Sequence, residues 1–175
     1  DVIYSCMSAA LRLEDTVPEA DFWHTYGIPD GTRIAIFQGS MTALRNLDNL
    51  ARATRYLEDD CRLVVVGGGD YQEKFLHTLE KEGNPERVVM VGWVNQSELL
   101  RFTVNADLGV LPYSAVDEYY SYAVPNKLME YFEATLPMLY DVSMKEVSMV
   151  AGEHGVGVGE DLSDPVKFGQ TLNRL

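Results

Sequence analysis

Short segments rich in valine and isoleucine alternate with amphipathic stretches of about ten residues along most of this chain. The segments expected to be strands are Arg33–Gly39, Arg62–Gly67, Val88–Gly92, Ala106–Pro112, Pro137–Val142 and Gly155–Gly159. Nearly continuous apolar strands separated by helices are typical of a parallel sheet covered on both faces. The sequence therefore predicts an α/β fold, a Rossmann-like doubly wound sheet of about six parallel strands with helices on both faces.

The stretches between these segments carry helix start signals, because a side-chain oxygen must accept from the free amides of a first turn. Residue pairs with capping-box spacing are Asp70 with Glu73, Asn95 with Glu98, and Ser143 with Glu146. Asn46 precedes another apolar series, and Asp164-Pro165 opens the last one. Upstream, Thr16 to Tyr26 predicts a short helix with Pro18 in its first turn, ended by Gly27.

Composition favours one soluble domain and excludes several partners. The chain has 175 residues, 46% of them hydrophobic, and a net charge of -13, which would repel nucleic acid. It has neither a spanning apolar run nor a signal peptide. Cys6 and Cys61 form no CxxC pair, so neither a disulfide framework nor a zinc site is indicated, and we expect a cytoplasmic location.

Both ends look like cuts in a longer protein. Asp1 is not a methionine, and Leu175 falls inside the helical pattern that begins at Asp164. We expect residues 1–31 to be a linker leading in from a missing N-terminal domain, and residues 32–175 to be one domain truncated at its C-terminal end. Membrane contact by the parent protein, peripheral to the inner face of the membrane, stays open.

The loops after the strands are the places to look for chemistry, since ligands of open parallel sheets bind beyond the carboxyl ends. Gly39 lets the main chain approach a ligand, and Arg45 offers a bidentate contact to phosphate. A tight turn and a solvated charge are the equally good alternative. Gly67-Gly68-Gly69 lacks the G-x-G-x-x-G spacing of a dinucleotide site, and we interpret it as a turn capped by Asp70.

A third loop leads into a helix that begins near Pro125. Val124, Leu128, Tyr131 and Phe132 would share its buried face, and Asn126, Lys127 and Glu130 another flank. A helix start with a nearby lysine and carboxylate can receive both a phosphate and a ribose diol. An ordinary surface pair between Lys127 and Glu130 is the simpler alternative.

Six ordered segments resemble the C-terminal domain of retaining GT-B glycosyltransferases, of the group 1 or family 4 type. They are Tyr26-Gly27-Ile28-Pro29, Phe37-Gln38-Gly39-Ser40 with Arg45-Asn46, Leu63 to Gly69, Val91-Gly92-Trp93-Val94, Ala106 to Tyr113, and Pro125 to Tyr131 leading to Leu136-Pro137. The resemblance covers most of the chain. It implies a nucleotide diphosphate sugar as the donor, with no cofactor and no metal, and an acceptor site in the missing N-terminal domain.

The resemblance also implies roles for individual residues. Glu130 would bind the ribose hydroxyls. Arg45 and Lys127 would neutralise the diphosphate beside the backbone of Gly39 and Ser40. Trp93 and Val94 would meet the nucleobase through their main chain, although Trp93 also suits simple packing. The loop at the donor sugar or phosphate would comprise Ser121, Tyr122, Ala123, Val124 and Asn126.

One position departs from the family pattern, because Tyr122 stands where a second carboxylate usually precedes the ribose-binding Glu130. Asp117 or Glu118 offers a nearby substitute, or the loop is solvated surface. The tyrosines Tyr113, Tyr119, Tyr120 and Tyr122 suit either stacking on a ligand or packing against the missing domain. The catalytic residues therefore stay unassigned.

The function expected from the sequence is the donor-binding half of a hexosyl-type glycosyltransferase, acting with retention in polysaccharide or glycoconjugate synthesis. The isolated fragment would be inactive. A non-catalytic, degenerate binding or regulatory module is the alternative, and a nucleotide-sugar epimerase ranks lower. His24, His77 and His154 show no metal or nucleophile spacing and are interpreted as structural.

Overall fold

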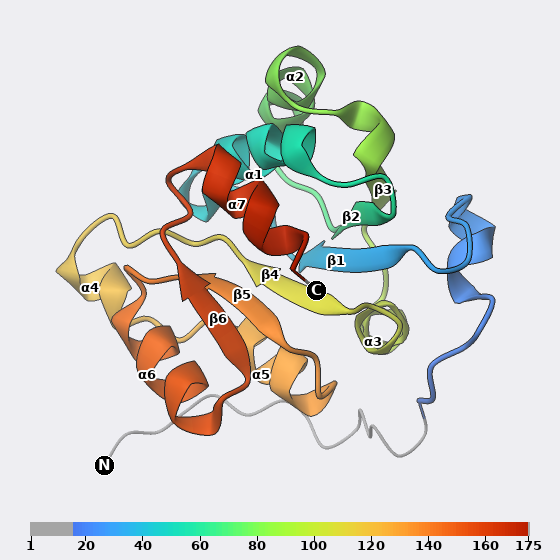
Figure 1. Cartoon of the computed structure of the whole chain (residues 1–175). Coiled ribbons are helices and arrows are strands. Elements are labelled where there is room, and N and C mark those ends of the chain that lie inside the picture. Colours follow the sequence, from blue (N-terminus) through green and yellow to red (C-terminus); the bar gives the residue numbers. More distant parts are fainter. Residues whose placement is uncertain (1–15, 175) are drawn as a thin grey trace.

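The computed structural model describes residues 16–174. One six-stranded sheet lies between two layers of helices (Figure 1). The strands are β1 (Arg33–Gln38), β2 (Cys61–Val66), β3 (Val88–Gly92), β4 (Leu108–Leu111), β5 (Met138–Asp141) and β6 (Gly157–Glu160). The helices are α1 (Leu47–Ala53), α2 (Gln72–Glu82), α3 (Gln96–Val104), α4 (Glu118–Ser121), α5 (Asn126–Glu133), α6 (Lys145–His154) and α7 (Pro165–Leu172). Short 3-10 helices are η2 (Phe22–Tyr26), η3 (Ala43–Arg45), η4 (Thr54–Tyr56) and η5 (Pro85–Arg87).

All six predicted strands are present, and every neighbouring pair in the sheet is parallel. Their order is β3-β2-β1-β4-β5-β6, which is the doubly wound order that reverses between β1 and β4. Helices α1, α2 and α7 cover one face, and α3, α5 and α6 cover the other (Figure 1). The predicted fold class is therefore confirmed.

Burial explains which strands are continuous apolar runs. Every residue of β4 and β5 is buried, and so is every residue of β1 and β2 apart from one near the start of each. The edge strands β3 and β6 are only partly buried. Central strands lie between two helical layers, whereas an edge strand keeps one side open, so the hydrophobic pattern weakens at both edges.

Helix α5 is fixed to the sheet by one fully buried tyrosine. The ring of Tyr131 lies over Gly109 of β4, where an added Cβ would come within 2.5 Å of it. The Tyr131 hydroxyl is 3.2 Å from the carbonyl oxygen of Ile36 in β1. Because this ring spans β4 and β1, it places the start of α5 at the point where the strand order reverses.

The capping predictions are correct at some helices and wrong at others. Asp164 accepts from the amides of Val166 and Lys167 at the start of α7, and the Asn95 amide donates to Glu98 at the start of α3. Asp70 is not a cap: Tyr71 occupies the N-cap of α2, and its amide donates to the carbonyl of Met41.

Two further residues that were predicted to be caps bond to distant parts of the chain. Ser143 does not cap α6, because its hydroxyl accepts from the amide of Ala115 and the N-cap is Met144. Asn46 stands at the N-cap of α1 but donates its side-chain amide to the carbonyl of Leu162. A side chain that can reach a distant backbone group satisfies that group rather than the local turn.

The predicted helix from Thr16 to Tyr26 is shorter and of a different type. Only η2 is helical, it is a 3-10 helix, and Gly27 ends it in the left-handed conformation. Trp23 explains the difference, because its indole nitrogen donates to the carbonyl of Asn105 and its ring packs on Phe102. Tertiary packing against α3 therefore sets the length of this element. The predictions for Cys6 and Leu175 lie outside the described residues.

Candidate functional site

A cavity of about 540 Å³ opens at the carboxyl ends of β1 and β4, where the strand order reverses. It is lined by Gly39, Ser40, Thr42, Leu44, Arg45, Trp93, Tyr113, Ser114, Tyr120, Ala123, Val124, Pro125, Asn126, Lys127 and Met144. The lining comes from the loops after β1, β3, β4 and β5 and from the start of α5. This is the place where doubly wound sheets bind ligands.

Gly39 and Ser40 of the cavity lining belong to a turn that lies against a second glycine-containing turn, the one after β2. The Gly39 amide donates to Val66, and the Met41 amide donates to Gly68. An added Cβ at Gly67 would come within 2.1 Å of the Gly39 oxygen, so only glycine permits this approach. The glycine run after β2 is therefore a packing feature, in agreement with the interpretation of this run as a turn.

Arg45 presents an unpaired cation to the cavity. Its guanidinium carbon lies 3.9 Å from the ring centroid of Tyr113. Within residues 16–174 the Arg45 side chain forms no hydrogen bond or ion pair, and its Nε is buried without a partner. Burial raises the pKa of Tyr113 to about 12, so the phenol stays neutral beside the cation. An anion is the natural ligand for such a guanidinium.

Helix α5 adds a second source of positive potential. It begins at Asn126 without a side-chain cap, and Pro125, Asn126 and Lys127 all line the cavity. Uncapped first-turn amides and the helix dipole both favour an anion. Among the cavity's lining residues in the described chain none is acidic, although the protein as a whole has a net charge of -13. The charged side chains of the lining, Arg45 and Lys127, are thus opposite in sign to the net charge.

Glu130 lies just behind the cavity wall rather than in it. The Lys127 ammonium is 2.8 Å from both oxygens of the Glu130 carboxylate. Lys127 lines the cavity and Glu130 does not, and their side chains are 19% and 7% exposed. Exposure of Glu130 to a ligand in the cavity requires Lys127 to turn away from it.

Comparison with known proteins gives the family of the chain. The family model described as glycosyl transferases group 1 matches residues 22–164. The chain belongs to the glycosyl transferases group 1 family. It is 29% identical over 94 residues to the uncharacterized glycosyltransferase MJ1607 of Methanocaldococcus jannaschii, which is 53% of this chain and 24% of that protein.

Two solved structures have a fold similar to that of this chain. Anabaena Alr3699/HepE in complex with UDP-glucose has a TM-score of 0.77 at 15% identity, over 99% of this chain and 47% of that one. The C-terminal domain of the group 1 family protein LpcC from Francisella tularensis has a TM-score of 0.68 at 14% identity, over 94% of this chain and 86% of that one. The chain thus has the fold of one half of a GT-B glycosyltransferase and spans under half the length of the longer relatives.

The cavity gathers most of the site residues predicted from the group 1 resemblance. Those in its lining are Gly39, Ser40, Arg45, Trp93, Ala123, Val124, Asn126 and Lys127. Four others are absent from the lining. Val94 packs on the core, Ser121 is buried and donates to the carbonyl of Glu118, Tyr122 is exposed, and Glu130 is shielded as described.

Tyr122, at the position where the resemblance implies a second carboxylate, is open to solvent. Tyr122 is 55% exposed, and the Lys145 ammonium lies 5.1 Å from its ring centroid. Of the other loop tyrosines, Tyr113 and Tyr120 line the cavity, whereas Tyr119 is 81% exposed. A cation and an aromatic ring therefore stand at the position where the sequence resemblance predicts an acid.

Sequence reasoning missed the residue that contacts Glu130 from behind. Gln38 ends β1 and is 1% exposed, and its side-chain nitrogen donates to the Glu130 carboxylate at 2.6 Å. A signal existed, because Gln38 is the one polar residue after the apolar run Ile34 to Phe37. Its partner could not be read from the sequence, since 92 positions separate the two residues.

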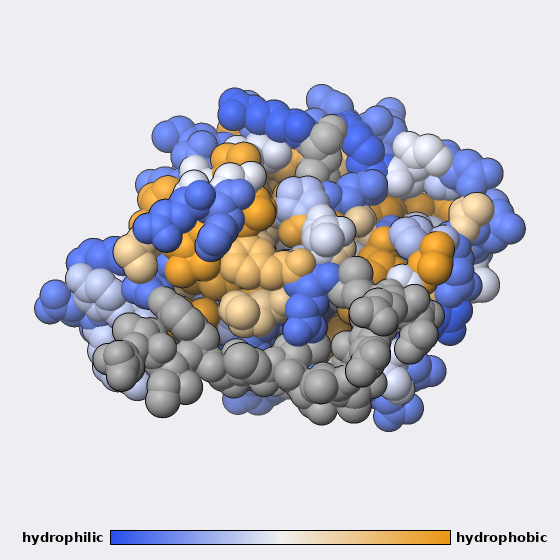
Figure 2. Space-filling view, turned by 90° about the horizontal axis from the view of Figure 1, so that it is seen from below, coloured by the Kyte–Doolittle hydropathy of each residue, from blue (hydrophilic) through white to orange (hydrophobic). Residues whose placement is uncertain are grey.

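A second, apolar cavity of about 780 Å³ lies between α5 and α6. Its lining includes Leu136 and Pro137 before β5 and Val156 before β6, so it reaches toward the amino ends of these strands. Figure 2 shows hydrophobic surface gathered on this side of the molecule. Glu153 is the only acidic residue in the lining that the structure describes, and no lysine or arginine occurs there. This cavity does not suit a diphosphate.

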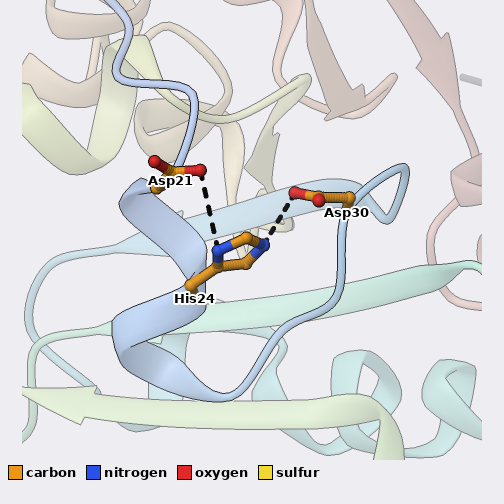
Figure 3. A group of neighbouring side chains, drawn as sticks. All are labelled: Asp21, His24 and Asp30. Carbon is orange, nitrogen blue, oxygen red and sulfur yellow. Dashed lines mark ion pairs between the residues drawn. The ribbon is translucent and has the colours of Figure 1, made fainter.

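One exposed group of side chains has the residue types of a metal site. In Figure 3, His24 lies between Asp21 and Asp30. Its Nε2 is 2.7 Å from Asp30, and its Nδ1 is 3.7 Å from Asp21. Because the two carboxylates approach opposite ring nitrogens, the arrangement is better described as a pair of contacts that ties η2 to the turn before β1.

Among residues 16–174, no helix is long and apolar enough to span a bilayer.

Proposed function

We propose that this chain binds the nucleoside diphosphate part of a nucleotide-sugar donor in the cavity between β1, β4 and α5. The observation that carries the proposal is an anion-binding cavity at the switch point of the sheet, formed by the unpaired Arg45 and the uncapped start of α5. In support, the crystal structure of Alr3699/HepE, which has a similar fold, is of its complex with UDP-glucose.

The roles that we propose for individual residues are supported by their places in the cavity. Arg45 and the backbone of Gly39 and Ser40 would hold the diphosphate, with Lys127 joining them when it leaves Glu130. Glu130 would then accept from the ribose hydroxyls. Trp93 is 68% exposed, and its indole nitrogen stands next to Gly68, which suits a surface over which a base can stack.

Val94 and the loop Ser121 to Asn126 complete the proposed donor site. Val94 would contribute its main chain at the base, and the loop would face the donor sugar. In a longer protein, an N-terminal domain would supply the acceptor site. The longer protein would transfer a hexosyl-type sugar with retention, in polysaccharide or glycoconjugate synthesis. It would need no metal, because fixed cations and a helix N-terminus can stabilise a departing diphosphate.

Calorimetric titration of this chain with UDP, GDP and ADP tests the donor site. We expect one nucleotide to bind and Arg45→Ala to weaken it by roughly 10- to 100-fold, as expected for loss of a charge-assisted hydrogen bond. Arg52→Ala is the matched control, because it removes the same charge from a surface pair with Glu82. Equal affinity in wild type and Arg45→Ala, or an equal loss in both variants, would rule out the assignment.

A non-catalytic module is the second candidate, and the exposed Tyr122 in place of the usual carboxylate is the observation that favours it. Such a module would bind the nucleotide but not split the donor. To distinguish the two functions, the full-length protein is incubated with a nucleotide sugar that contains the nucleotide found to bind. Release of nucleoside diphosphate supports the transferase, and tight binding without release supports the module.

A further inference from the structure

The carboxylate of Glu130 ends a chain of hydrogen bonds that runs through two buried side chains, Gln38 and then Thr103. Gln38, at the end of β1, donates from Nε2 to Glu130 Oε2 at 2.6 Å. The Thr103 hydroxyl, on α3, lies 2.8 Å from Gln38 Oε1. Gln38 and Thr103 are each 1% exposed, so neither can contact a ligand in the cavity directly.

The direction of this hydrogen-bond chain is fixed by its chemistry. A carboxylate only accepts, so the NH2 group of Gln38 must face Glu130 and its carbonyl oxygen must face Thr103. The Thr103 hydroxyl is the donor at the carbonyl end of Gln38, and its single proton reaches Gln38 Oε1 at 2.8 Å or the Leu99 carbonyl at 2.9 Å. Without that hydroxyl proton, the Gln38 amide loses the contact that holds its carbonyl end.

A glutamine is an unfavourable residue at this place for packing alone. The four residues before it, Ile34 to Phe37, are buried and apolar. Burying a side-chain amide costs about 1–3 kcal/mol unless its groups are hydrogen-bonded. In the described chain its side-chain bonds go to Glu130 and Thr103 alone. The polar pair thus serves the carboxylate of Glu130.

The contacts leave the two carboxylate oxygens unequal. Oε2 accepts from Gln38 and Lys127, whereas Oε1 accepts from Lys127 alone. Once Lys127 turns to a diphosphate, Oε1 has both lone pairs free and Oε2 has one. Two hydroxyl donors of a ribose can then bind to a carboxylate whose plane is held by Gln38.

We propose that Gln38 and Thr103 are positioning residues that fix the Glu130 carboxylate for the ribose diol and so make the site selective for ribose over 2′-deoxyribose. This inference rests on the proposed function of the cavity. It assigns the selectivity to the alignment of the carboxylate by the two buried residues, as well as to the presence of the carboxylate.

The test is titration of the chain with UDP, 2′-deoxy-UDP and inorganic pyrophosphate. We expect the wild type to prefer UDP over 2′-deoxy-UDP by about tenfold or more, since a hydrogen bond to a charged group is lost. Thr103→Val keeps the shape but removes the hydroxyl, and should reduce the preference to about twofold. Thr103→Ser keeps the hydroxyl and should retain it, and Gln38→Leu should behave as Thr103→Val does.

Pyrophosphate distinguishes positioning from general damage. A merely structural effect would weaken all three ligands together and leave the ratio of the two nucleotide affinities unchanged, whereas loss of alignment lowers the ratio and leaves pyrophosphate affinity as in the wild type. An unchanged ratio in both Thr103→Val and Gln38→Leu would overturn the inference alone. Failure of the wild type to bind either nucleotide would overturn the proposed function and the inference with it.

Discussion

Gly67→Ala should destabilise the protein and displace the Gly39 turn, which lines the candidate site. Gly67 has φ +135°, a region that alanine avoids, and its added Cβ would lie 2.1 Å from the Gly39 oxygen and 2.9 Å from the Gly39 carbonyl carbon. These are backbone atoms, so no side-chain rotation relieves the overlap. Backbone strain and overpacking together should cost about 3 kcal/mol. For a chain of this size that lowers Tm by roughly 6–12 °C.

Thermal unfolding followed by circular dichroism measures this effect. Gly152→Ala is the matched control, because Gly152 is exposed in α6 and a Cβ there meets no atom within 4 Å. Alanine favours a helix over glycine by about 1 kcal/mol, so the control should be unchanged or slightly more stable. If Gly67→Ala unfolds at the wild-type temperature, the close approach of the two turns does not exist as described.

Two further outcomes concern burial and capping. Burial raises the pKa of the Cys61 thiol from 9.0 to about 11, so the folded protein keeps a proton that the unfolded chain loses. The stability of the wild type relative to Cys61→Ala should therefore decline as pH rises from 9 through 11, and a constant difference in urea denaturation across that range would contradict this. Asp164→Ala removes the acceptor for the amides of Val166 and Lys167 and should cost about 1 kcal/mol, measured by the same denaturation. Ser163→Ala, one residue away, is its control and should cost less.

Much of the site was predictable because it follows from local sequence. The loop glycine Gly39, the cation Arg45 and the start of α5 follow strands in the expected way, and strand ends meet at one edge of a parallel sheet. The state of Glu130 was not predictable. Its shielding by Lys127 was one of two alternatives at the i, i+3 spacing, and its contact with Gln38 depends on the packing of β1 against α5.

Capping residues show the same division. Asp164 behaves as its local pattern indicates, whereas the hydroxyl oxygen of Ser143 accepts from the amide of Ala115. A short polar side chain reaches either its own turn or a neighbouring loop, and the choice depends on which backbone group is otherwise buried without a partner. That group belongs to another part of the chain, so the sequence around the polar residue does not indicate it.

The sequence by itself determined the architecture, because hydrophobic period and strand spacing are local properties that admit few packings, and a parallel sheet covered on both faces is the one that buries these runs. Tertiary structure alone decided which side chains of the site are paired with one another and which are left without a partner. It brought Gln38, Thr103 and Glu130 together from three elements, and it left Arg45 unpaired beside Tyr113. Hydrogen bonds and ion pairs act over a few ångströms in space, whatever the distance along the chain.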